Sequence, residues 1–226
     1  METNQELYEQ RPSRKRREER NRELADIIEF VEFTNRFRSI ERTIWFKGVE
    51  GRERNGEHTF QLSFTAKYVN HRCGLFLQDK LLTDYAEVHD LIETYAQDTP
   101  AHPDPERPNQ PTHVDKEKRE RAARKRISEE WGARYPAMVQ AMWRYHAQSD
   151  EESRFVYALD KLVANLNIYC DEGRTNHKLG ATLEWELGYK RPRMAKHPAI
   201  AELYEELVNR YSAQPDLFAP LQHAAE

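Results

Sequence analysis

The sequence has few of the features that mark membrane-bound, secreted or disulfide-stabilised proteins. Its 226 residues include only 2 cysteines, Cys73 and Cys170, which lie far apart and have no Cys or His partner at zinc-finger spacing. We therefore expect reduced thiols that pack as small apolar groups. No run approaches the roughly 18 apolar residues of a membrane span, and the polar start Met1–Asn4 lacks an apolar signal core. These absences predict a cytoplasmic protein that does not interact with a membrane.

The chain also lacks a strong excess of either charge. It has 35 Lys and Arg residues against 39 Asp and Glu residues, a net charge of -4, so it has no electrostatic reason to bind nucleic acid. Basic residues do crowd the segment from Arg11 to Arg22, and a basic arm could hold a phosphate backbone. Glutamates interrupt this segment and aromatic residues are missing from it, which fits a solvated, partly disordered helix better. We expect residues 1–23 to form a charged N-terminal arm.

Apolar residues recur at helical spacing along most of the remaining chain, and no strand-like alternation is present. With 38% apolar residues, the chain fits one all-α domain over residues 24–212, followed by a tail at residues 213–226. A loop is expected at residues 46–55, which contain Gly48 and Gly51. Five of the 11 prolines fall between Pro100 and Pro111, which excludes a helix there. This proline-rich insert, about residues 100–114, is predicted to be either a lid beside a site or a simple insertion. The predicted helices cover residues 24–37, 56–71, 78–97, 115–130, 136–147, 150–170 and 200–211.

Two imidazoles and two carboxylates on three of these helices form a candidate metal site. His58 shares a helical stripe with Leu62, and Asp160 is set among apolar residues. A buried carboxylate is costly unless it is paired or binds a cation, so from the residues alone Asp160 is either a metal ligand or the partner of a cation such as Arg154 or Lys161. His89 and Asp90 are adjacent and point about 100° apart on a helix, so only a ligand between their faces could engage both. This mixed donor set suits a first-row divalent metal with open coordination positions.

The order of these residues resembles the HD-domain phosphohydrolases, in which a lone His, a His-Asp dyad and a distant Asp bind one divalent ion. The resemblance covers about residues 24 to 170 and implies an all-α HD-domain helical bundle with a metal site in its core. His58, His89, Asp90 and Asp160 would be the ligands. The implied ion is Mn, Co, Fe or Mg, with a first-row transition metal favoured. Three stretches are similar to the 5'-deoxynucleotidase branch of this family: Arg42-Thr43-Ile44-Trp45, Val88-His89-Asp90-Leu91-Ile92-Glu93 with Asp98-Thr99-Pro100, and Ala158-Leu159-Asp160-Lys161-Leu162.

The resemblance also implies roles at the substrate. Arg42 would contact the phosphate, Trp45 would help to exclude a ribose 2'-hydroxyl, and Asp98 would approach the sugar. In that branch the Arg and Trp are adjacent, whereas here two residues separate them, and Trp45 could equally be a core aromatic residue. Glu93 stands one helical turn beyond His89 on the same face, which predicts a general acid or base. Lys116 and Lys118 are candidates for a downstream lysine of the branch.

These observations predict a phosphoric monoester hydrolase whose substrate is a nucleotide, most simply a deoxynucleoside 5'-monophosphate. One alternative is a deoxynucleoside triphosphate triphosphohydrolase, for which Lys47, Arg52 and Arg54 could supply the extra cations. Another is a catalytically silent HD module that binds nucleic acid or protein, although such a module would have no need for Glu93. The resemblance also suggests a homodimer.

Overall fold

The structure is a computed structural model that describes residues 14–220. Residues 1–13 of the predicted arm and residues 221–226 of the predicted tail lie outside the described part. The chain forms two compact units, residues 1–36 and residues 37–226. Each unit is described by itself.

The first unit consists of a single described element, helix α2 (Arg14–Arg38), which runs on to the start of the second unit. The helix begins within the segment that we expected to be a charged arm, ten residues before the apolar pattern starts at Leu24. Leu24, Ile27, Ile28 and Val31 follow one another at helical spacing. These four side chains are each at least 50% exposed, so the expectation that they pack was wrong, whereas Phe37, the last residue of the predicted stripe, is buried.

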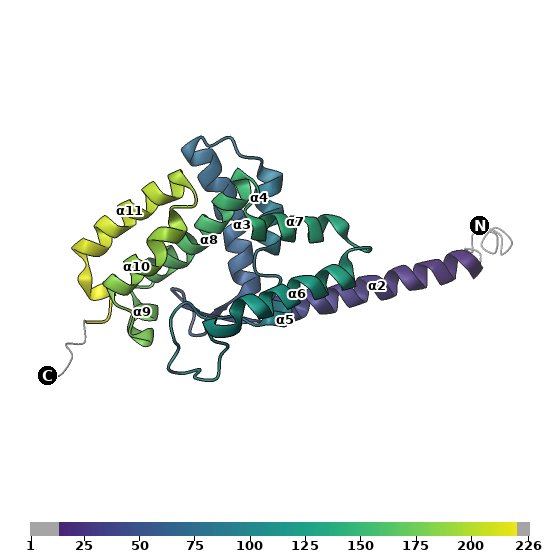
Figure 1. The fold of residues 1–226 in the computed structure, drawn as a ribbon, viewed down its shortest axis with the longest axis horizontal. Coiled ribbons are helices and arrows are strands. Elements are labelled where there is room, and N and C mark those ends of the chain that lie inside the picture. The colour runs from purple at the N-terminus through teal and green to yellow at the C-terminus, as the bar shows by residue number, and fades with distance from the viewer. Residues whose placement is uncertain (1–13, 221–226) are drawn as a thin grey trace, which may run out of the picture. The chain divides into compact units, whose positions relative to one another are not determined.

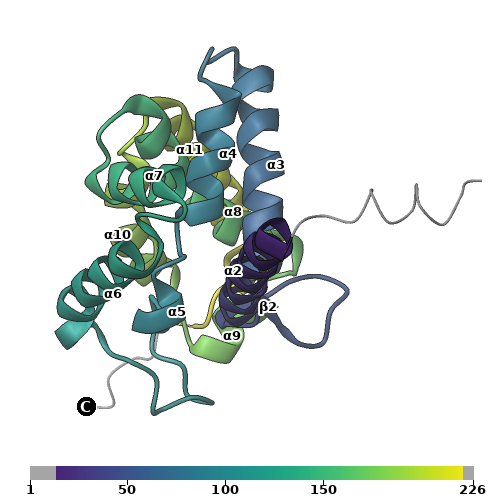
Figure 2. The same cartoon turned by 90° about the vertical axis from the view of Figure 1, so that its right-hand side faces the viewer.

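The second unit is a bundle of helices, which confirms the predicted all-α fold (Figures 1 and 2). Helix α8 (Glu151–Cys170) is its centre, with thirteen buried residues, and it contacts α3, α4, α7, α10 and α11. It begins where the sequence predicts, because the Asp150 carboxylate accepts a hydrogen bond from the Ser153 backbone N–H at 2.8 Å. The surrounding helices are α3 (Asn55–Cys73), α4 (Asp79–Val88), α5 (Glu93–Ala96), α6 (Lys116–Trp131), α7 (Pro136–Ala147), α9 (Arg174–Leu179), α10 (Leu183–Met194) and α11 (Pro198–Ala213). Short 3-10 turns cover His113–Asp115 and Pro215–Leu217.

A small β-hairpin contradicts the expectation that strands are absent and that residues 46–55 are all loop. Strand β1 (Glu41–Trp45) pairs antiparallel with strand β2 (Arg52–Arg54). Three residues of β2 are too few to give a recognisable alternation, and main-chain hydrogen bonds carry most of the pairing. The hairpin lies against α8 and α9. In this hairpin Glu53 is buried and Arg42 is partly exposed. The Glu53 side chain faces His58 of α3, and the Arg42 side chain faces Asp160 of α8.

The helix predicted over residues 78–97 is interrupted at the His-Asp dyad. Helix α4 ends at Val88, the chain turns through residues 89–92, and the one-turn helix α5 begins at Glu93. The proline-rich segment has no helix before His113, as predicted. Cys73 and Cys170 are free but exposed, so the expectation that they pack as small apolar groups was wrong. None of the described helices is both long and apolar enough to span a membrane.

Candidate metal centre

The four predicted ligands meet at one point inside the second unit. His58 comes from α3, His89 and Asp90 from the turn after α4, and Asp160 from the middle of α8. Each offers one nitrogen or oxygen atom, and these four atoms all lie within 4.8 Å of one another. His58, His89 and Asp160 are buried, while Asp90 is partly exposed. The fold therefore brings together residues that are up to 102 positions apart in the sequence.

The hydrogen bonds around the two imidazoles fit a bound cation. His89 donates from Nδ1 to the Ala86 carbonyl oxygen at 2.7 Å, because a carbonyl can only accept. In a neutral ring with this tautomer, Nε2 is the atom that carries the lone pair. Nε2 lies 2.8 Å from Oδ2 of Asp90 and is buried without a hydrogen bond among the described residues. Nε2 of His58 forms a hydrogen bond with Oδ1 of Asp160 at 2.9 Å, whereas its Nδ1 atom is buried without a hydrogen bond among the described residues. Two imidazoles and two carboxylates at this spacing fit a first-row divalent cation, with Ala86 fixing the ring of one ligand.

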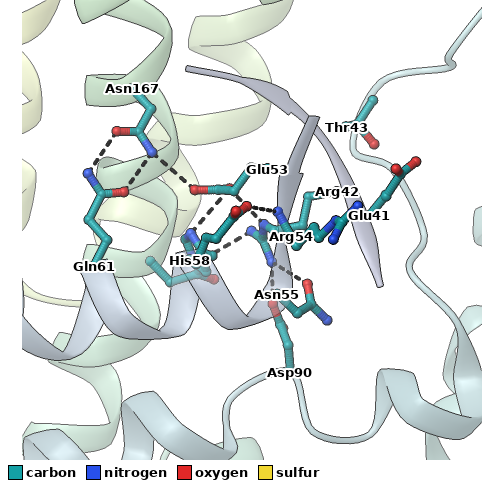
Figure 3. Close-up of polar contacts among 12 residues, drawn as sticks. Glu41, Arg42, Thr43, Glu53, Arg54, Asn55, His58, Gln61, Asp90 and Asn167 are labelled. Atoms are coloured by element: carbon teal, nitrogen blue, oxygen red, sulfur yellow. Dashed lines mark hydrogen bonds and ion pairs between the residues drawn. The ribbon is translucent and has the colours of Figure 1, made fainter. Parts of the chain in front are cut away.

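Arg42 lies among the carboxylates of this centre. Its Nε donates to Oε2 of Glu53 at 3.0 Å and its Nη1 donates to Oδ2 of Asp90 at 2.5 Å (Figure 3). Nη2 of Arg42 is 3.6 Å from Oδ1 of Asp160. Burial acts to lower the pKa of Arg42, but the carboxylates, led by Asp90, raise it overall. The guanidinium is thus permanently charged and partly neutralises the acidic cluster.

Glu53 is a buried residue of the site that the sequence analysis missed. One of its oxygens accepts the hydrogen bond from Arg42 and lies 3.4 Å from Nδ1 of His58, and the other accepts from Nδ2 of Asn167 at 3.2 Å (Figure 3). Asn167 also exchanges hydrogen bonds with the Gln61 amide at 2.8 and 2.9 Å. Glu53 could have been recognised from the sequence only as an acidic residue on a predicted strand. Strand β2 was not predicted, so this signal was missed. Glu53 therefore orients a metal ligand and Arg42 together.

We expect Glu53→Gln to weaken binding of a divalent cation by about 10- to 100-fold, because partners that orient a ligand contribute this much to metal affinity. The variant should also lose about 1–3 kcal/mol of unfolding free energy, because a buried guanidinium loses a charged partner. Titration with Mn²⁺ and thermal unfolding of the metal-free protein measure the two effects. Glu41→Gln, at an exposed position of β1, is the control that should change neither. A cation affinity equal to wild type would contradict the role given to Glu53.

Glu93 and Asp98 lie beside the ligands and line the same cavity. Nδ2 of Asn55 donates to Oε2 of Glu93 at 2.7 Å, which fixes the carboxyl group. Burial first, and then the negative charges of Asp90 and Asp98, raise the pKa of Glu93 well above its ordinary value. Burial also raises the pKa of Asp98. Raised carboxyl pKa values in a cleft are typical of groups that transfer protons.

The cavity beside the centre has a volume of about 420 Å³. The ligands His89, Asp90 and Asp160 form part of its wall, and Arg42 lies next to them. Helix α10, to which the sequence analysis gave no role, contributes another part through residues at three- and four-residue steps. Near Asp160 the wall also includes Lys161, the partner of that carboxylate. The α10 residues that line the cavity are Trp185, Glu186, Tyr189, Lys190 and Arg193.

Several sequence-predicted residues lie elsewhere. Trp45 is buried between Arg52 and Lys178, whose cationic groups lie 3.9 and 4.9 Å from its ring centre, and it is not part of the described cavity wall. Lys47 faces Glu172 at 3.5 Å, and Arg52 is paired with Asp104 and Glu106. Lys116 does line the cavity, together with three histidines for which no role was predicted, His102, His113 and His146. The described wall does not include Lys47, Arg52, Arg54 or Lys118.

Comparison with known proteins identifies similar folds. A family model described as HD domain matches residues 34–201. A crystal structure of a predicted metal-dependent phosphohydrolase from Magnetospirillum magnetotacticum MS-1 is similar, with a TM-score of 0.68, 24% identity, and coverage of 87% of this chain and 96% of that one. The structure of PH0347 protein from Pyrococcus horikoshii OT3 has a TM-score of 0.54, 20% identity, and coverage of 83% and 99%. No curated protein gives a significant match.

Proposed function

The chain belongs to the HD-domain family, and we propose that it is a metal-dependent phosphohydrolase that removes the phosphate from deoxynucleoside 5'-monophosphates. The observation that carries this proposal is the convergence of His58, His89, Asp90 and Asp160, with Glu93 beside them in a cavity open to a substrate. The name of the Magnetospirillum relative, which describes a metal-dependent phosphohydrolase, supports the reaction class.

Each residue of the centre would have its own role in the reaction. A divalent cation bound there would polarise the phosphoryl oxygen and make a water molecule a stronger nucleophile. Arg42 would keep the carboxylates of Asp90 and Asp160 ionised and in place. Glu93, fixed by Asn55, would transfer a proton to or from the attacking or leaving oxygen. Asp98, on the same wall, would accept a hydrogen bond from the sugar.

The size and wall of the cavity support a nucleotide as the substrate. A volume of about 420 Å³ lies within the range of roughly 300–1,000 Å³ that is usual for small-molecule sites. Trp185 offers an aromatic surface in the wall and is held from two sides. Its ring stacks on that of Tyr189 with centres 5.1 Å apart, and His102 meets it edge-on at 4.7 Å. Such a rigid aromatic surface is what a nucleobase stacks on.

The test is a panel of deoxy- and ribonucleotides, each supplied with Mn²⁺, Co²⁺ or Mg²⁺. We expect metal-dependent release of orthophosphate from deoxynucleoside 5'-monophosphates, with slower release from the ribonucleotides. A triphosphatase would instead release tripolyphosphate or pyrophosphate from the triphosphates. A silent binding module would release none of these products, and salt-dependent binding to DNA without turnover would favour that alternative.

A second prediction concerns the aromatic wall. Trp185→Ala should raise KM for nucleoside monophosphates by about 10-fold, because stacking on a base contributes about 1–3 kcal/mol. The KM for a small monoester without a ring, such as glycerol phosphate, should stay within about twofold. Trp143→Ala, at an exposed position outside the described cavity wall, is the matched control. Equal rises in KM for both substrates would contradict a base-stacking role.

A further inference from the structure

Lys190 stands out among the cations of the cavity because it is buried and forms no hydrogen bond or ion pair with the residues that the structure describes. Only 7% of the residue is exposed, and it lines the cavity from α10. Among the described residues, no carboxylate oxygen lies within 4.0 Å of Nζ of Lys190, and Nζ donates no hydrogen bond. A buried ammonium without a partner is expensive for a fold. Because Lys190 lies in a cavity wall, an anion bound in the cavity could compensate its charge.

The nearest acidic candidate on the same helix does not fill this role. Glu186 lies one turn before Lys190 and also faces the cavity, but its carboxyl group accepts a hydrogen bond from Nδ2 of Asn165. Burial raises the pKa of Glu186, which favours its neutral form and weakens it further as a counter-ion. Burial lowers the pKa of Lys190 and outweighs the opposing effect of the Glu186 charge, as expected for an ammonium that is poorly compensated.

Lys190 and the metal centre belong to the same cavity. Lys190 lines the same cavity as Asp160, Lys161 and Arg42, and the charges of these three residues act on its pKa, so an anion at Lys190 would share the cavity with the centre. The other cations at this end of the cavity are engaged. Arg42 is held by three carboxylates, and Lys161 pairs with Asp160. Arg193 donates from Nη1 to the Tyr189 carbonyl oxygen at 2.5 Å and lies over that ring.

We propose that Lys190 is the residue that binds the phosphoryl oxygens of the substrate, from the α10 wall of the cavity. The identity of the anion as a phosphate monoester rests on the proposed function. The assignment moves the role of phosphate anchor from Arg42, whose donors point at protein carboxylates, to a cation that no described carboxylate holds in an ion pair. Lys190 and Trp185 lie on the same helix and line the same cavity, so α10 would hold the phosphate and the base together.

The experiment measures binding of inorganic phosphate by calorimetry to wild type and to Lys190→Met, each in the metal-free and the Mn²⁺-loaded form. We expect the Kd of the variant to rise at least 10-fold, which corresponds to about 1.4 kcal/mol. In phosphate-free buffer the Tm of the variant should be equal to or higher than that of wild type, because an unpaired buried charge has been removed. A merely structural lysine would show the opposite, a lower Tm.

Two companion variants sharpen the result. Lys196→Met removes an exposed lysine just beyond α10 and should bind phosphate as wild type does. Glu186→Gln should bind phosphate at least as tightly as wild type. The inference would be overturned by an unchanged affinity for phosphate in Lys190→Met, or by a lower Tm in that variant. An equal loss of phosphate affinity in either companion variant, or no binding of phosphate by wild type, would also overturn it. If wild type binds phosphate through Lys190 but hydrolyses no monoester, the proposed function fails while the anion site stands.

Discussion

Replacing Glu93 by Gln is expected to lower kcat for phosphate release by about 100- to 10,000-fold, the usual contribution of a positioned general acid or base. The amide has the same shape as the carboxylate and can still accept the hydrogen bond that Asn55 donates to Oε2 of Glu93. It cannot exchange a proton with the attacking or leaving oxygen. The four metal ligands are unchanged, so binding of Mn²⁺ measured by calorimetry should stay within about threefold of wild type. This combination separates proton transfer from metal binding.

The matched control is Glu120→Gln. Glu120 lines the same cavity from α6 but is surrounded by cations, with Lys116 at 3.6 Å and Arg124 at 3.8 Å. Its replacement should leave kcat within about threefold of wild type. A Glu93→Gln protein that keeps a third or more of the wild-type kcat would remove Glu93 from the mechanism, whatever its metal affinity.

The sequence could predict the all-α fold and the cluster of four potential ligands because both leave local signals. Helices have a period that is visible in any window of a dozen residues. The start of α8 carried its own signal in Asp150 and Ser153, which form the expected hydrogen bonds. The charged and imidazole side chains among apolar residues, such as His58 and Asp160, had to be either paired or bound to a cation. The structure shows the pairing at Asp160, which contacts Lys161, and it places the same carboxylate against His58 within the cluster of four potential ligands.

What the sequence could not predict depends on contacts between distant segments. Glu53 looks like an ordinary charged residue until the three-residue strand β2 turns it toward His58 and Asn167. Lys190 looks like a surface lysine, because nothing in its neighbourhood shows that α10 closes the cavity against α8. Helix α4 stops at Val88 rather than at Gln97, since the turn that follows it places His89 and Asp90 toward one centre. Such tertiary requirements override a local helical pattern.

Asp160→Asn is expected to have the largest effect, because Asp160 takes part in two interactions at once. As a ligand it should contribute most of the affinity for the cation, so the variant should bind Mn²⁺ at least 100-fold more weakly and show no measurable phosphate release. In the folded protein, Lys161 and then His58 hold the pKa of Asp160 well below its usual range against the opposing effect of burial. A lowered pKa means that the ionised form stabilises the fold at neutral pH, and an amide cannot replace it.

The metal-free variant should therefore also lose about 3 kcal/mol of unfolding free energy, the usual cost of removing one partner of a buried ion pair. Chemical denaturation of metal-free wild type and variant measures this loss, and Asp84→Asn is the control, since Asp84 forms only a surface pair with Lys80 at 2.5 Å. The two readouts distinguish the roles. A carboxylate that served only as the partner of Lys161 would lower stability and leave the Mn²⁺ titration unchanged, and that result would contradict the assignment of Asp160 as a ligand. Loss of Mn²⁺ binding together with the loss of stability would show that one buried side chain both supports α8 in the bundle and completes the metal centre.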